Sequence, residues 1–135
     1  MEYAIFDTSV WINFSRGFEN KETALLEKYL SEYPDLIILT PTIIQEFLMG
    51  LKTEKHLIQF EIHFKRLTIL EDNWLENSVA AAKLYFNLRK KGISVRKSTD
   101  CLIAQFAIKN NFLLVHNDTD FDLIAKGTNL KTIIL

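Results

Sequence analysis

The segment YAIFDTSVWI (residues 3–12) contains the pattern that decides the fold. Residues 3–6 form a short apolar run, which predicts a buried strand. Thr8 or Ser9 then offers a cap for a helix that follows at once. A buried strand that leads directly into a helix, with Asp7 at the junction, is typical of α/β proteins, whose sites lie beyond the carboxyl ends of parallel strands.

The same alternation continues along the chain. Further strands are predicted over 36–39, 67–70, 112–116 and 131–135. Helices are predicted from residue 8 to Gly17, over 21–32, 41–51, 55–65 and 73–90 (before Gly92), from Ser98 or Thr99 onward, and near 120–125. On the helix over 21–32, we expect Ala24, Leu25, Tyr29 and Leu30 to be buried. The pattern predicts an α/β fold of three layers, α/β/α, around a mostly parallel sheet of four to five strands.

The bulk composition narrows the class of protein. With 135 residues, we expect a single domain over 1–135, and a hydrophobic fraction of 48% is enough for a packed core. A net charge of -1 gives no global basic field for nucleic acid. One cysteine, Cys101, allows no intrachain disulfide and is expected in the core. No apolar run approaches the roughly 18 residues of a membrane helix, so we expect a cytoplasmic protein.

Acidic residues fall where such a fold would gather them. Asp7 follows the first strand directly, and Asp118 follows the strand over 112–116 after one intervening residue. Asp100 stands in the first turn of its helix, and Glu46 lies on the flank of the buried stripe of the 41–51 helix. Taken singly, each has a plainer interpretation, as a helix cap, a first-turn charge or a solvated side chain. Together they predict four carboxylates at one edge of the sheet.

Carboxylates that converge repel one another unless a cation offsets the repulsion. Oxygen ligands without cysteine or histidine partners favour Mg²⁺ or Mn²⁺ over zinc. Such ions keep bound waters, and they can activate one of these for hydrolysis of a phosphodiester bond. The acids therefore indicate a metal-dependent hydrolase.

Four segments give the pattern a family resemblance. They are IFDTSVWI (5–12), TPTIIQEFLMG (40–50), STDCLIAQFA (98–107) and LLVHNDTDFDLIA (113–125). In order and spacing they resemble the PIN-domain family, and among its members the VapC-type toxins of VapBC toxin–antitoxin systems are the most similar. The resemblance covers essentially the whole chain.

The resemblance implies a PIN-like fold and an endoribonuclease that uses Mg²⁺ or Mn²⁺. It places the catalytic and metal-binding acids at Asp7, Glu46, Asp100 and Asp118. It also implies RNA as the substrate, a small VapB-like antitoxin as the partner, and a homodimer. The last motif offers Asp120 and Asp122 as alternatives to Asp118, and His116 stands where relatives often carry threonine.

Two further groups of residues accompany the acids. Hydroxyl groups at Thr8, Ser9, Ser98 and Thr99 can orient the carboxylates, although each residue also suits a helix cap. A run of cations precedes Asp100, formed by Arg89, Lys90, Lys91, Arg96 and Lys97. It is either a solvated helix end or a surface that contacts RNA phosphates.

Other functions fit the sequence less well. A receiver domain needs paired acids after the first strand, and a haloacid-dehalogenase-like phosphatase needs Asp-x-Asp there, whereas residues 7–9 are Asp-Thr-Ser. The remaining alternatives share the PIN fold: a nuclease outside toxin–antitoxin systems, acting in RNA processing or on DNA, or a scaffold without activity. A scaffold normally loses its acids, and this chain retains all four.

Overall fold

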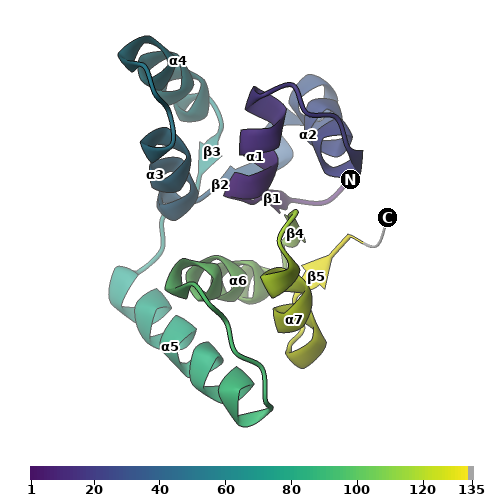
Figure 1. Ribbon diagram of the computed structural model, residues 1–135, viewed down its shortest axis with the longest axis vertical. Coiled ribbons are helices and arrows are strands. Elements are labelled where there is room, and N and C mark those ends of the chain that lie inside the picture. The colour runs from purple at the N-terminus through teal and green to yellow at the C-terminus, as the bar shows by residue number, and fades with distance from the viewer. Residues whose placement is uncertain (134–135) are drawn as a thin grey trace.

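Five short parallel strands form the centre of the molecule, seen in a computed structural model that describes residues 1–133 (Figure 1). The strands are β1 (Ala4–Phe6), β2 (Ile37–Leu39), β3 (Thr68–Ile69), β4 (Leu113–Val115) and β5 (Lys131–Thr132). Their order in the sheet is β3-β2-β1-β4-β5, and every neighbouring pair is parallel. The predicted α/β class is confirmed, with a sheet that is wholly parallel among the described strands.

The helices lie close to their predicted positions. They are α1 (Thr8–Ser15), α2 (Lys21–Glu32), α3 (Pro41–Met49), α4 (Glu54–Lys65), α5 (Trp74–Lys90), α6 (Ser98–Asn110) and α7 (Thr119–Gly127), with a 3-10 turn, η1 (Pro34–Leu36), before β2. Helices α1 to α4 contact one another, and α5, α6 and α7 form a second group (Figure 1). Strand order runs outward from β1 in both directions, and right-handed crossovers then place the two groups on opposite faces of the sheet.

The central strand is buried on both faces. Ala4, Ile5 and Phe6 of β1 are fully buried, and Ile5 is paired with Ile38 on one side and Leu114 on the other. Burial on both faces explains why the strand is a continuous apolar run without alternation. The strand also fixes the site, because its carboxyl end is flanked by the ends of β2 and β4.

One predicted buried face is partly wrong. Helix α2 buries Thr23, Leu26 and Tyr29, whereas Ala24 is exposed. Thr23 tolerates burial because its hydroxyl belongs to a capping box, in which it accepts a hydrogen bond from the backbone N–H of Asn20 at 2.9 Å. The periodicity of apolar residues could not identify a buried threonine.

At the carboxyl edge of the sheet, two acidic residues are the N-caps of helices. Asp7, rather than Thr8 or Ser9, is the N-cap of α1, and Asp118 is the N-cap of α7. Thr40 caps α3, and its side chain accepts from the backbone N–H of Ile43 at 3.2 Å. A carboxylate that caps the helix directly after a strand is held at the strand end, where a site forms.

Two glycines end helices in the left-handed conformation. Gly17 and Gly92 adopt φ of +73° and +82°, which a residue without a Cβ reaches at no steric cost. Of the strand predicted over 131–135, the structure shows Lys131–Thr132 as β5, and the part of the prediction over 134–135 lies outside the described residues. Within residues 1–133, none of the helices combines the length and apolar character needed to cross a bilayer.

Candidate metal centre

Three carboxylates form the tightest acidic group at the carboxyl edge of the sheet. Asp100, Asp118 and Asp120 each offer an oxygen within 4.8 Å of the others. Asp100 comes from the first turn of α6, Asp118 follows β4, and Asp120 lies in the first turn of α7. Asp100 and Asp120 are each only 4% exposed. The structure thus brings together two of the predicted acids and adds Asp120, one of the alternatives in the last motif.

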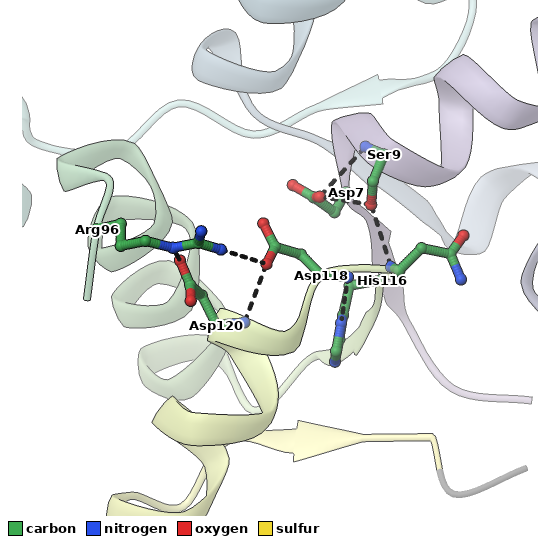
Figure 2. A network of polar contacts seen from close by, with 7 residues as sticks. Asp7, Ser9, Arg96, His116, Asp118 and Asp120 are labelled. Carbon is green, nitrogen blue, oxygen red and sulfur yellow. Dashed lines mark hydrogen bonds and ion pairs between the residues drawn. The ribbon is translucent and has the colours of Figure 1, made fainter. Parts of the chain in front are cut away.

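Asp7 lies beside this group, at the end of β1. It is 5% exposed, and its backbone N–H donates to the carbonyl of Val115 at 2.9 Å, which ties the ends of β1 and β4 together. Its Oδ2 accepts hydrogen bonds from the hydroxyl of Ser9 at 2.8 Å and from the backbone N–H of Ser9 at 3.2 Å. Figure 2 shows the carboxylates of Asp7 and Asp118 facing the same space from α1 and from the turn after β4.

Ser9 also links the two acidic turns. Its hydroxyl accepts a hydrogen bond from the backbone N–H of Asn117 at 3.1 Å, while it donates to Asp7 (Figure 2). Asn117 immediately precedes Asp118. One neutral hydroxyl therefore sets the distance between the start of α1 and the start of α7.

Glu46 reaches the same edge from α3 and is held by two threonines. Its Oε1 accepts from the hydroxyl of Thr8 at 3.1 Å, and its Oε2 accepts from the hydroxyl of Thr99 at 3.4 Å. Thr8 neighbours Asp7 and Thr99 neighbours Asp100, so Glu46 is oriented by residues adjacent to two other acids. The hydroxyl of Ser98 differs, because Ser98 is exposed and lines a hollow between α5 and α6, and in residues 1–133 it has no hydrogen bond to a carboxylate.

The electrostatics of Asp100 show that negative charge is concentrated here. Burial, together with the charges of Asp7 and Asp118, raises the pKa of Asp100 to about 7, against a smaller opposing effect of Lys97. Its Oδ2 is buried and has no hydrogen-bond partner among the described residues. A buried polar atom without a partner is rare and needs an explanation. The all-oxygen donor set and this unpartnered oxygen fit a hard divalent cation.

Arg96 is the cation that contacts the group. Its Nε donates to Oδ2 of Asp120 at 3.1 Å, and a terminal guanidinium nitrogen lies 4.0 Å from Oδ1 of Asp118 (Figure 2). The carboxylate of Asp120 raises the pKa of Arg96. Arg96 lies in the segment before α6, whereas Asp120 lies in α7, so no sequence motif predicts this contact.

Asp122 and His116 lie to one side of the acids. The side chain of Asp122 is 62% exposed and approaches Nε2 of His116 at 3.5 Å, so Asp122 does not join the group of three. His116 is mostly buried, and its Nδ1 accepts a hydrogen bond from the backbone N–H of Asp118 at 3.1 Å (Figure 2). The ring of His116 therefore supports the turn that carries Asp118.

The cationic run divides into residues with different partners. Arg89 and Lys90 lie over the exposed aromatic rings of α5, with Lys90 Nζ 4.6 Å from the ring centroid of Phe86. Lys91 donates to the carbonyl of Gly127 at 2.8 Å, at the end of α7. Lys97 is exposed at the N-cap of α6. Among these five residues, Arg89, Lys90 and Lys97 can contact phosphates without breaking a hydrogen bond to the described part of the chain.

These features define a class: a parallel α/β protein with an acidic, oxygen-donor site where the central strand and its neighbours end. Comparison with known proteins identifies the family. The PIN domain model matches residues 4–127, and the chain belongs to the PIN-domain family. Ribonuclease VapC11 of Mycobacterium tuberculosis is 33% identical over 127 residues, which cover 94% of this chain and 95% of that protein.

Solved structures share the fold. VapBC2 from Rickettsia felis, bound to a DNA fragment from its promoter, superimposes with a TM-score of 0.74 at 21% identity and covers 96% of each chain. VapBC-1 from nontypeable Haemophilus influenzae gives a TM-score of 0.71 at 20% identity, again over 96% of each chain. These structures show the shared fold, and the sequence relatives confirm the predicted resemblance to VapC ribonucleases.

Proposed function

We propose that this chain is an endoribonuclease toxin of a type II toxin–antitoxin pair, which hydrolyses RNA phosphodiester bonds with the help of Mg²⁺ or Mn²⁺. The observation that carries the proposal is the group of carboxylates formed by the buried Asp100 and Asp120 and the partly buried Asp118, in which one oxygen of Asp100 has no partner among residues 1–133. The similarity to VapC ribonucleases supports the reaction and the substrate class.

Asp100 and Asp118 would hold the cation, with Asp120 as a further ligand. Asp7 lies beside them, and Glu46 lies at the same edge of the sheet. A divalent cation bound there supplies Lewis-acid activation of water and offsets the charge of the phosphate. Ser9 orients Asp7, and Thr8 and Thr99 orient Glu46. These hydroxyls fix the acids without neutralising them, so their charge remains available to a cation.

The partners follow from the same similarity. A small VapB-like antitoxin, a homodimeric toxin and a cytoplasmic site of action are proposed, because the solved relatives are VapBC complexes. The exposed cations Arg89, Lys90 and Lys97 are proposed to contact RNA phosphates on the approach to the acids.

The test is cleavage of total cellular RNA by the purified chain with Mg²⁺, with Mn²⁺ and with EDTA. Discrete fragments that require the metal are expected, and they identify the RNA that is cut. Asp35→Asn serves as the matched control, since Asp35 is an exposed acid in η1, at the opposite edge of the sheet. Cleavage that persists in EDTA would contradict the role of the metal. Cleavage of single-stranded DNA but not RNA would favour a PIN nuclease outside toxin–antitoxin systems, and no cleavage of either would favour a scaffold.

A further inference from the structure

Arg96 occupies an unusual place for a surface arginine. Its guanidinium contacts Asp120 at 3.1 Å and approaches Asp118 at 4.0 Å. Among residues 1–133, no other lysine or arginine forms an ion pair with Asp100, Asp118 or Asp120. Arg96 is therefore the internal counter-ion of the acidic group.

The burial of the two partners is unequal. The side chain of Asp120 is 5% exposed, whereas that of Arg96 is 74% exposed. A buried carboxylate needs a partner, because leaving it unpaired in a low-dielectric site is unfavourable. The arginine, in contrast, can turn into solvent without losing packing. The contact is thus more important to Asp120 than to Arg96, and a competing cation can take the place of the guanidinium.

The contact covers only part of the group. Arg96 lies against Asp118 and Asp120. In the described part of the chain, Oδ2 of Asp100 has no partner, and the side chain of Asp7 is bonded only to neutral groups of Ser9. The Asp118 and Asp120 half of the site has a cation against it, whereas the Asp100 and Asp7 half forms no ion pair among residues 1–133. A cation can therefore enter beside Asp100 and Asp7 while the arginine remains in place.

We propose that Arg96 competes with the divalent cation for Asp118 and Asp120, and that full loading of the site requires its guanidinium to turn away. This inference rests on the proposed metal-dependent function. The planar guanidinium fork fits a phosphate as well as it fits a carboxylate, and it does not lose its proton. An RNA phosphate is the anion that accepts the released arginine, so RNA binding and metal loading reinforce each other.

The test measures metal binding without RNA and without activity. The full chain, stripped of metal with EDTA, is titrated with Mn²⁺ by calorimetry, and free Mn²⁺ is followed by electron paramagnetic resonance. Arg96→Gln is expected to bind Mn²⁺ about tenfold more tightly than the wild type, because a charge-assisted hydrogen bond to a buried carboxylate no longer has to be broken. The matched control is Lys97→Gln, which makes the same change in charge one residue away, without the contact.

Lys97→Gln is expected to tighten Mn²⁺ binding less than Arg96→Gln does. Arg96→Lys should fall between the wild type and Arg96→Gln, since an ammonium cannot span both acids. Thermal melting in EDTA verifies that each variant is folded, and if Arg96→Gln does not fold, the comparison of Arg96→Lys with the wild type decides the question.

Equal Mn²⁺ affinity in Arg96→Gln and Lys97→Gln would overturn the proposal, since net charge alone would then act. Weaker binding in Arg96→Gln would also overturn it, because Arg96 would then only hold the acids in position. Failure of the proposed function gives a different result, in which folded wild type, Arg96→Gln and Asp100→Asn all fail to bind Mn²⁺.

Discussion

The two sides of the acidic edge are held in different ways. On the hydroxyl side, Asp7 and Glu46 accept hydrogen bonds from Ser9, Thr8 and Thr99, all neutral groups on the surrounding helices. On the arginine side, Asp118 and Asp120 lie against a mostly exposed guanidinium. The first arrangement fixes acids and preserves their charge, whereas the second neutralises charge with a group that can leave. Asp100 stands between the two sides, and its pKa reflects the charge that remains.

Removing the acid between the two sides should have the largest effect. Asp100→Asn is expected to reduce RNA cleavage by about 1,000-fold or more, beyond the 10- to 100-fold typical of residues that only orient a ligand. The proposed metal site loses one of its two most buried carboxylates, while the fold keeps a side chain of the same shape. Initial rates of cleavage, with Asp35→Asn as control, provide the measurement. A loss below tenfold in a folded variant would remove Asp100 from the reaction.

The hydroxyl side is tested by deleting single oxygens. Thr8→Ala, Ser9→Ala and Thr99→Ala are each expected to lower cleavage by about 10- to 100-fold, because each frees a carboxylate that the hydroxyl orients. Since Thr8 and Thr99 bind the same Glu46, their double variant should lose less than the product of the single losses. Ser98→Ala is the matched control, because that hydroxyl is exposed. Strict additivity of the Thr8 and Thr99 effects would mean that they act separately.

The burial of Asp100, together with repulsion from the neighbouring acids, should lower the stability of the metal-free protein as pH rises. In the unfolded chain Asp100 ionises near the ordinary aspartate pKa of 3.8, whereas in the folded protein its pKa is about 7. Between these values the folded state binds the extra proton, so the free energy of unfolding falls as pH rises, and the contribution is constant above pH 7.

Asp100→Asn removes this dependence. In EDTA at pH 8 it should raise the free energy of unfolding by about 1–3 kcal/mol, with no such gain near pH 4. Urea unfolding of both proteins at several pH values supplies the measurement. A variant that is less stable than the wild type at pH 8 would show that the favourable contacts of Asp100 outweigh the cost of its burial and of the repulsion.

The smallest effect is expected outside both sides, on α5. The double variant Arg89→Gln with Lys90→Gln should weaken RNA binding severalfold and reduce the slope of log affinity against log salt by about 1.4, since each of the two phosphate contacts on a single strand contributes roughly 0.7. Binding is measured with inactive Asp100→Asn protein over a series of salt concentrations. An unchanged slope would leave these cations as partners of the Tyr85 and Phe86 rings alone.

The sequence was sufficient for the strand and helix order, because buried strands appear as apolar runs and the helices carry clear start and stop signals. It also placed Asp7 and Asp118 at one edge, since Asp7 follows its strand directly and Asp118 follows its predicted strand after one residue. It could not show that Asp120 faces the group while Asp122 does not, because both lie in the first turn of α7 and differ only in rotation about the helix. Nor could it pair Arg96 with Asp120, a contact between side chains on separate elements.

The pairing of β1 with β4 has a consequence for the synthesis of the chain. It joins residue 4 to residue 113, and it places Asp7 beside Asp118 only after most of the chain exists. A nascent chain that has left the ribosome as far as α5 already contains Asp7 and Glu46. At that point β4, the second neighbour of β1 in the sheet, has not yet emerged. The acids that act together are therefore assembled late. The acidic edge therefore cannot form until Asp100 and Asp118 have been synthesised, however early the first strand and Asp7 leave the ribosome.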